Sequence, residues 1–223
     1  MDEVKIIDVK RTILEDNDLD ALNLSKELKK KGTFLLNLMS SPGSGKTTTL
    51  IKTIKYLEDK LSIGVMEADI DSDVDAKKIK EETKAEAIQL HTGGMCHLDA
   101  SMTREGLSYL NKHDLVFLEN VGNLVCPAEF ATGASKCAMI LAVTEGDDKP
   151  LKYPLMFSIC DVILINKIDV IDYFDFDMTK VIENIRKINN KAKIIPICAK
   201  SGEGILEFSN WLNEEVRLWK EEE

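Results

Sequence analysis

The chain has 223 residues, of which 44% are hydrophobic and 30% are charged, a composition typical of one globular domain with a sizeable core. Its formal net charge of −10 argues against a nucleic-acid partner, and no apolar run approaches the roughly 20 residues that a membrane helix needs. The five cysteines are scattered and form no C-x-x-C pair, and the acidic N-terminus has no apolar signal region. We therefore expect a cytoplasmic, reduced protein whose cysteines either fill the core or bind metal.

The first predicted element is a helix that follows a polar lead-in over residues 1–16. Asn17 or Asp18 can cap this helix, which is expected to run to about Lys31. Its buried face is predicted to comprise Leu19, Leu22 and Leu28.

Residues 34–50 form the stretch around which the rest of the chain is organised. An apolar strand over residues 34–39 runs into a glycine-rich loop, and the helix that follows has apolar residues at helical spacing, namely Leu50, Ile54 and Leu57. Strand, loop and helix in this order are the setting of a phosphate-binding loop. Glycines let successive backbone N–H groups turn toward a phosphate, and the helix N-terminus adds partial positive charge.

The loop matches the pattern G-x-x-x-x-G-K-[ST] except at its first position, which is Ser40 instead of glycine. Lys46 can reach the β- and γ-phosphates and assist catalysis, and the Thr47 hydroxyl can bind Mg²⁺. The alternative is an ordinary glycine-containing turn, which the order of strand, Lys-Thr pair and helix disfavours. The residues expected to bind the phosphates are Pro42, Gly43, Ser44, Gly45, Lys46, Thr47 and Thr48.

Beyond residue 50, apolar strand candidates alternate with helical stretches. The strand candidates are residues 62–67, 86–90, 114–119, 138–144, 161–166 and 193–198, and the helices are residues 73–84, 98–112, 177–189 and 203–219. Strands that are apolar on both faces predict a mostly parallel sheet of about seven strands with helices on both sides. We expect the α/β fold of a P-loop NTPase over residues 33–223, with residues 1–32 as an N-terminal extension and helix packed on it.

Asn166, Lys167 and Asp169 follow an apolar strand in the arrangement N-K-x-D, which is typical of guanine-nucleotide proteins. A carboxylate at Asp169 can accept hydrogen bonds from N1–H and the exocyclic amine of guanine, a donor pair that adenine lacks. Lys167 can lie along the base and Asn166 can tie the loop, whereas the alternative is a polar turn that caps the next element. Ala199 and Lys200 are similar to the S-A-K segment of the same proteins, whose backbone N–H meets the guanine O6. The predicted nucleotide is therefore GTP.

Glu119 ends an apolar strand, where the Mg²⁺-linked acid of a nucleotide hydrolase lies. Gly122 can offer its N–H to the γ-phosphate and so report the loss of that phosphate. Alternating acids follow the preceding strand, and we expect Asp69 and Asp71 to complete the Mg²⁺ site with Thr47 and Glu119. No glutamine follows Gly122, so an aspartate of this loop is expected to orient the attacking water, with Asp71 as the candidate.

Cys96 and His97 follow a Gly-Gly pair, and Cys126 lies three residues beyond the segment 119–123 and before a proline. A glycine-flexed loop can turn both adjacent side chains toward one ion, and two thiolates with one imidazole suit Zn²⁺ or Ni²⁺. The alternative is that Cys126 is packed in the core and that His97 caps a helix. Three protein ligands leave a tetrahedral ion incomplete, so we expect a water or a second subunit to complete the ligand set.

Together these residues resemble the hydrogenase nickel-incorporation GTPases, the HypB family of the SIMIBI class of P-loop GTPases. The most discriminating stretch is Glu-Asn-Val-Gly-Asn-Leu-Val-Cys-Pro over residues 119–127, and the resemblance covers the chain from about residue 20 onward. Some members carry an N-terminal cysteine cluster or His-rich tract, which this chain lacks. Only the metal site within the GTPase domain is therefore supported.

The resemblance implies a Mg²⁺-dependent, GTP-hydrolysing metallochaperone that binds nickel or zinc and assists nickel insertion into the hydrogenase large subunit. It also implies a homodimer linked to nucleotide or metal, and a partnership with the small zinc protein HypA. Two rivals stay open. One is the urease accessory GTPase, whose metal motif is Cys-Pro-His where this chain has Cys96-His97, and the other is a GTPase switch or scaffold without a metal role.

Overall fold

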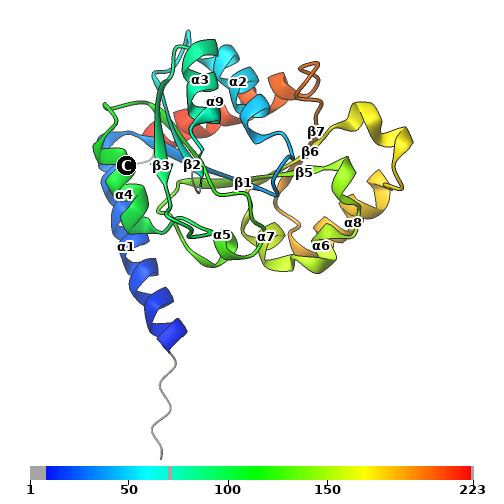
Figure 1. Ribbon diagram of the computed structural model, residues 1–223, viewed down its shortest axis with the longest axis horizontal. Helices are drawn as coiled ribbons and strands as arrows, with labels where there is room; N and C mark the ends of the chain where they lie inside the picture. The colour runs from blue at the N-terminus through cyan, green and yellow to red at the C-terminus, as the bar shows by residue number, and fades with distance from the viewer. Residues whose placement is uncertain (1–8, 70–71, 222–223) are drawn as a thin grey trace, which may run out of the picture.

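A parallel sheet forms the centre of the computed structural model, with the strand order β3-β2-β4-β1-β5-β6-β7 (Figure 1). The structure describes residues 9–69 and 72–221, and neighbouring strands in these ranges pair in parallel. The seven strands of the described residues are β1 (Phe34–Ser40), β2 (Ile63–Asp69), β3 (Glu86–His91), β4 (Leu115–Glu119), β5 (Lys136–Ala142), β6 (Val162–Asn166) and β7 (Lys193–Pro196). The predicted α/β class with a mostly parallel sheet of about seven strands is confirmed.

Helices cover both faces of the sheet (Figure 1). One face carries α2 (Lys46–Leu57), α3 (Val74–Glu82) and α9 (Ile205–Glu221). The other side carries α1 (Val9–Lys31), α4 (Ala100–Ser108), α5 (Cys126–Glu129), α6 (Lys149–Lys152), α7 (Pro154–Ile159) and α8 (Met178–Ile188). Two 3-10 turns, η1 (Val143–Glu145) and η2 (Ile168–Tyr173), follow β5 and β6. Among the described helices, none is long and apolar enough to cross a membrane.

Alternation along β1 explains why both faces of the sheet are buried. Phe34, Leu36 and Leu38 pack in one core cluster with α2 and α9, whereas Leu35 and Met39 pack with helices of the opposite face. All seven residues of this strand are buried. The predicted apolar stripe of α2 belongs to the first cluster and comprises Leu50, Ile54 and Leu57.

Helix α1 begins earlier than predicted, because Val9 and not Asn17 or Asp18 starts it. Asn17 lies inside the helix, where its Oδ1 accepts a hydrogen bond from Ala100 N at 3.0 Å and its Nδ2 donates to Ala131 O at 3.0 Å. The polar side chain that suggested a helix cap therefore serves a tertiary contact. The N-terminal part of α1 projects from the body of the molecule (Figure 1).

The buried face of α1 also differs from the prediction. Leu28 is buried as expected, but Leu19 and Leu22 are 62% and 52% exposed, and Ala21 and Leu24 take their places in the core. Ion pairs stabilise this orientation of α1 on the body of the protein. Arg104 of α4 contacts two acidic side chains of α1, Asp20 at 2.8 Å and Glu27 at 2.6 Å. A set of leucines alone does not settle which face of a helix packs.

Several short elements were absent from the prediction. Helices α5, α6 and α7 have four to six residues each, which is too short to show a helical period in the sequence. All three still carry buried residues, namely Pro127, Pro150, Met156 and Phe157. Strand β7 ends at Pro196 and not at residue 198, since Cys198 N donates to Glu203 O across a turn.

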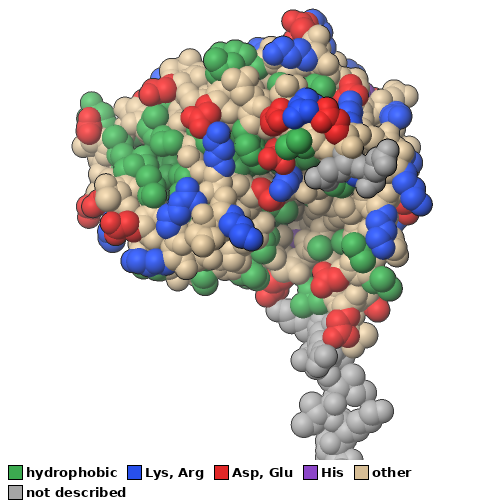
Figure 2. All heavy atoms as spheres, turned by 180° about the vertical axis from the view of Figure 1, so that it is seen from behind, with side chains coloured by type: hydrophobic (Ala, Val, Ile, Leu, Met, Phe, Trp, Pro, Cys, Tyr) green, Lys and Arg blue, Asp and Glu red, His purple; other side chains and the backbone are tan. Residues whose placement is uncertain are grey.

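Acidic and basic side chains are interspersed on the face that Figure 2 shows, turned by half a revolution from Figure 1. The chain as a whole has more acidic than basic residues, with a net charge of −10. The face in this view does not present the continuous basic patch that nucleic-acid binding requires.

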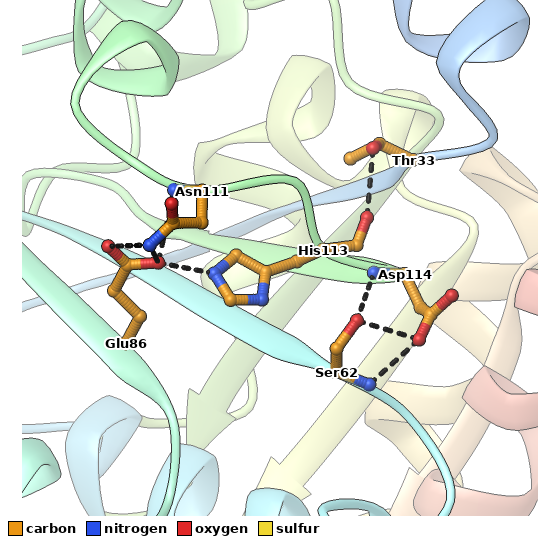
Figure 3. A network of polar contacts seen from close by, with 6 residues as sticks. All are labelled: Thr33, Ser62, Glu86, Asn111, His113 and Asp114. Carbon is orange, nitrogen blue, oxygen red and sulfur yellow. Dashed lines mark hydrogen bonds and ion pairs between the residues drawn. The ribbon is translucent and has the colours of Figure 1, made fainter.

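A polar network ties the starts of three strands together at the amino end of the sheet (Figure 3). Asp114, just before β4, accepts hydrogen bonds at Oδ2 from Ser62 N at 2.8 Å and from Ser62 Oγ at 2.7 Å. Its Oδ1 pairs with Lys220 of α9. Beside it, His113 Nε2 lies 2.6 Å from Glu86 Oε2 at the start of β3.

Replacing Asp114 by alanine is expected to lower the free energy of unfolding by about 1–2 kcal/mol, because Ser62 and Lys220 lose their acceptor. Burial raises the pKa of Asp114, but the bonds from Lys220 and Ser62 outweigh it and hold the pKa at about 2. As the pH falls, the carboxyl group of Asp114 is therefore protonated near pH 4 in the unfolded chain, whereas in the folded protein it stays ionised until about pH 2. The stabilisation is present above about pH 4 and is lost as the pH falls toward 2.

Urea denaturation at pH 7, 4 and 3, followed by circular dichroism, measures this effect. The matched control is Asp59→Ala, which removes an exposed carboxylate paired only with Lys84 at the surface. The control should leave stability nearly unchanged. A difference between the parent and Asp114→Ala that stays constant from pH 7 to pH 3 would contradict the assignment.

Candidate nucleotide and metal sites

The phosphate loop connects β1 to α2 at the carboxyl end of the sheet, and Ser40 is its polar centre. Ser40 Oγ accepts hydrogen bonds from Lys46 Nζ at 3.0 Å and from Ser44 Oγ at 2.5 Å, and it donates to Ser41 O at 2.7 Å. Ser40 and Ser44 are both buried. The serine that departs from the sequence pattern thus holds the lysine and closes the loop on itself.

Gly45 lies where the phosphate loop meets the guanine-motif loop. Its φ is +101°, and a Cβ there would lie 2.4 Å from Asn166 Nδ2, so only glycine fits. Asn166 Nδ2 donates to Ser44 O at 2.8 Å, and Asn166 Oδ1 accepts from Ala199 N at 3.0 Å. Asn166 was predicted to tie its own loop, and in the structure it joins that loop to the phosphate loop and to the loop that contains Ala199.

A cavity of about 220 Å³ lies beside this junction. Asp169 is exposed at it, and Lys167, whose φ of 65° is left-handed, donates from Nζ to Gly43 O at 2.8 Å. The backbone N–H of Ala199 donates to Asn166, so this donor is already used within the protein and is not free to meet a base. The lining comprises Gly45, Thr48, Asn166, Lys167, Asp169, Val170, Cys198, Ala199 and Lys200, which include the residues predicted to surround the base.

Three carboxylates meet next to Thr47. Glu119 Oε1 accepts a hydrogen bond from Thr47 Oγ1 at 3.2 Å. One oxygen each of Glu67, Asp75 and Glu119 lies within 4.8 Å of the others. Glu67 and Glu119 are only 3% and 2% exposed, and the Oε2 atom of each is buried without a hydrogen-bond partner.

Burial raises the pKa of Glu119 to about 7, although Lys46 and Thr47 oppose the change. Burial, followed by repulsion from Glu119, raises the pKa of Glu67 to about 8. Two buried carboxyl groups with unpartnered oxygens fit a hard divalent cation, which would supply positive charge in addition to that of Lys46. Thr47, Glu67, Asp75 and Glu119 are the donors that this structure offers to Mg²⁺.

This donor set differs from the predicted one. Asp69 Oδ1 accepts a hydrogen bond from Ser72 N at 2.9 Å, and Asp69 is not a member of the three-carboxylate group. Asp71 lies outside the described residues. The sequence did carry a signal for Glu67, because this acid follows an apolar run in β2, whereas Asp75 is half-buried in the first turn of α3 and is one of several acids in that stretch.

Cys96, His97 and Cys126 come together although 30 residues separate the two cysteines. The Sγ atoms lie 2.8 Å apart, and His97 Nδ1 lies 3.9 Å from Cys96 Sγ. The imidazole of His97 stacks on Phe130, with ring centroids 3.8 Å apart. The alternative in which His97 caps a helix is wrong, because Asp99 caps α4 by accepting from Met102 N at 2.8 Å.

Electrostatics around these three side chains favour a neutral imidazole. Burial lowers the pKa of His97, and metal binding requires the neutral ring. A hydrogen bond with Cys96 is the main cause that raises the pKa of the Cys126 thiol, with burial second. The loss of a proton from Cys126 therefore needs a positive charge nearby, which a bound metal ion would provide.

Comparison with known proteins gives a consistent result. Residues 34–196 match the model of the family described as CobW/HypB/UreG, nucleotide-binding domain. Over 95% of its length the chain is 44% identical to the hydrogenase maturation factor HypB of Rhizobium leguminosarum, of which it covers 71%. It is 38% identical to the hydrogenase/urease maturation factor HypB of Helicobacter pylori, with 96% of this chain and 89% of the relative covered.

A solved structure is similar as well. The crystal structure of HypB from Helicobacter pylori in complex with nickel superposes with a TM-score of 0.85 at 37% identity, covering 91% of this chain and 95% of that one.

Proposed function

Because the chain belongs to the HypB family of hydrogenase maturation factors, we propose that it hydrolyses GTP and uses the nucleotide to control a nickel or zinc ion on its way to the hydrogenase large subunit. The observation that carries this proposal is the convergence of Cys96, His97 and Cys126 beside a complete phosphate loop. A nucleotide switch without a metal role does not account for two thiols and an imidazole at one point.

Hydrolysis is proposed to depend on positioning and electrostatics. Lys46 would lie along the β- and γ-phosphates. Thr47, Glu67, Asp75 and Glu119 would hold Mg²⁺, which would neutralise charge between the phosphates. The residue proposed to orient the attacking water is Asp71, and Asp75, which lies beside Glu119, is a second candidate. Asp69 would act on this site from a greater distance, through its charge.

The nucleotide is proposed to be a guanine nucleotide because of what surrounds the base cavity. Asp169 would accept from N1–H and the exocyclic amine, and Lys167 would cover one face of the base while it holds Gly43. Asn166 fixes the geometry between base and phosphates by bonding both loops. The backbone N–H of Lys200 is the donor proposed for the guanine O6.

The metal ion is proposed to bind through Cys96, His97 and Cys126, which fill three positions of a four-coordinate shell. A second copy of the chain, related by a two-fold axis, would complete the shell and link metal binding to a homodimer. An accessory protein of the HypA type is the partner proposed to exchange the ion. The protein would act in the cytoplasm, where thiols stay reduced.

Replacing Cys126 by alanine is expected to weaken Ni²⁺ and Zn²⁺ binding strongly, because one of three ligands is lost. The loss should be at least as large as the roughly 10- to 100-fold effect of removing an outer-shell partner. Competition with a chromophoric chelator measures it. The matched control is Cys137→Ala, since Cys137 is a half-buried thiol outside the group of three. Equal affinity in Cys126→Ala and the control would refute the site.

Extracts lacking this protein separate the candidate functions. The parent should restore nickel transfer to hydrogenase, and Cys126→Ala should not. Urease is a second candidate target, because the Helicobacter pylori relative is described as a hydrogenase/urease maturation factor. Restoration of urease activity alone would favour urease as the target. If Cys126→Ala restored hydrogenase as well as the parent does, the function would not depend on metal binding at this site.

A further inference from the structure

We propose that Asn123 is the positioning residue that couples the nucleotide state to the metal site, by holding together the two loops that supply the thiols. The inference rests on the proposed function and names the regulator of that same site. It concerns a residue that contacts neither the phosphate loop nor an ion through its own side chain, so its role is mechanical.

The first step is a contact between the phosphate loop and the residue before Asn123. A Cβ at Gly122 would lie 3.0 Å from Pro42 Cγ and 3.2 Å from Pro42 N, so the backbone of Gly122 rests directly on the phosphate loop. Any rearrangement of Pro42 or of the γ-phosphate beside it is therefore felt at Gly122.

The second step is the pair of hydrogen bonds that the Asn123 amide makes. Its Oδ1 accepts from Val125 N at 2.8 Å, in the residue before Cys126, and its Nδ2 lies 3.5 Å from Cys96 O, which it contacts as a donor. One side chain thus touches both strand-end loops.

The third step is the stiffness of the segment between the two sites. Upstream, Asn120 N donates to Leu38 O at 3.0 Å and Asn120 Nδ2 donates to Asn37 Oδ1 at 3.1 Å, both on β1. Downstream, Leu124 and Pro127 are buried. A short segment anchored at both ends turns a shift at Gly122 into a rotation of Asn123, because its other residues are held.

Rotation of Asn123 changes the distance between the Cys96 and Cys126 loops, since the amide bonds both. Metal ligands tolerate little displacement, so a change of this kind alters affinity. Coupling between two sites is reciprocal for binding, and typical couplings are about 5- to 150-fold. Metal binding should accordingly change the affinity for a GTP analogue by the same factor.

The test compares the parent, Asn123→Ala and Asn123→Asp. Ni²⁺ and Zn²⁺ affinities are measured with GDP and with a non-hydrolysable GTP analogue, and nucleotide affinities are measured with and without metal. The parent should show at least about a fivefold ratio between the two nucleotide states. In Asn123→Ala the ratio should collapse to within about twofold in both measurements, while metal binds in both states because all three ligands remain. Asn123→Asp keeps the acceptor for Val125 N–H but loses the donor to Cys96 O, and its ratio should collapse as well.

The control is Asn111→Ala, which removes an amide at the opposite end of the sheet and should keep the parent ratio (Figure 3). A parent that binds no metal overturns the proposed function. A parent that binds metal equally in both nucleotide states overturns the coupling and the role of Asn123 together, and leaves the metal site standing. A ratio preserved in Asn123→Ala overturns the role of Asn123 alone.

Discussion

Replacement of Lys46 by alanine is expected to lower GTP turnover by at least about 100-fold, because the charge aimed at the β- and γ-phosphates is removed. The pKa of Glu119 should also rise in this variant, because Lys46 is the main influence that lowers it against the effect of burial. Phosphate release under saturating GTP measures the effect. Thermal unfolding followed by circular dichroism checks that the fold persists.

Lys55→Ala is the matched control for this experiment. Lys55 lies on the same helix, but its side chain is 44% exposed and pairs with Glu82 at the surface, 3.0 Å away. Turnover in the control should equal that of the parent. Hydrolysis in Lys46→Ala at the level of the Lys55→Ala control would show that the loop described here does not position the phosphates.

The second large effect is a change of base. Asp169→Asn should weaken GTP binding by roughly 30- to 150-fold, since the two donors on the edge of guanine lose a charged acceptor. The same substitution should admit xanthine nucleotides, whose carbonyl accepts from the new amide where the guanine amine repelled it. Titration with fluorescent GTP and XTP measures both changes in one series.

Asp172→Asn tests whether the effect belongs to the position or to the charge. Asp172 is an exposed carboxylate in the same 3-10 turn and does not line the base cavity. It should leave both affinities unchanged. If the unmodified protein bound ATP as tightly as GTP, the assignment of Asp169 would have to be withdrawn.

The phosphate loop and the guanine motif were predictable because local chemistry dictates them. Gly45 has a φ of +101°, which favours glycine, and Lys46 starts the helix that follows, so residue type and spacing carry the geometry. The apolar strands were predictable because burial on both faces makes most of their positions hydrophobic. Such features depend on neighbours in the chain.

Features that depend on distant partners were not predictable from the sequence. Asn17 has the chemistry of a helix cap but bonds Ala100 and Ala131, which only the fold brings near. Glu67 lies in a strand whose register places it opposite Glu119, and pairing partners are not encoded locally. The sequence grouped Cys96, His97 and Cys126, and the structure brings them together, but the stacking of His97 on Phe130 followed from tertiary structure alone.

The strand order gives the two arms of the Cys96–His97–Cys126 group different mechanical compliance. Cys126 follows β4, which is held on both sides by β2 and β1, whereas β3, which leads to Cys96 and His97, pairs among the described strands with β2 alone. Displacing the first arm strains two ladders of hydrogen bonds, and displacing the second strains one. Tetrahedral and square-planar ions demand different ligand angles. If these side chains bind metal as proposed, the adjustment from one geometry to the other would fall on the arm of β3, while the arm of β4 would keep its position relative to the phosphate loop.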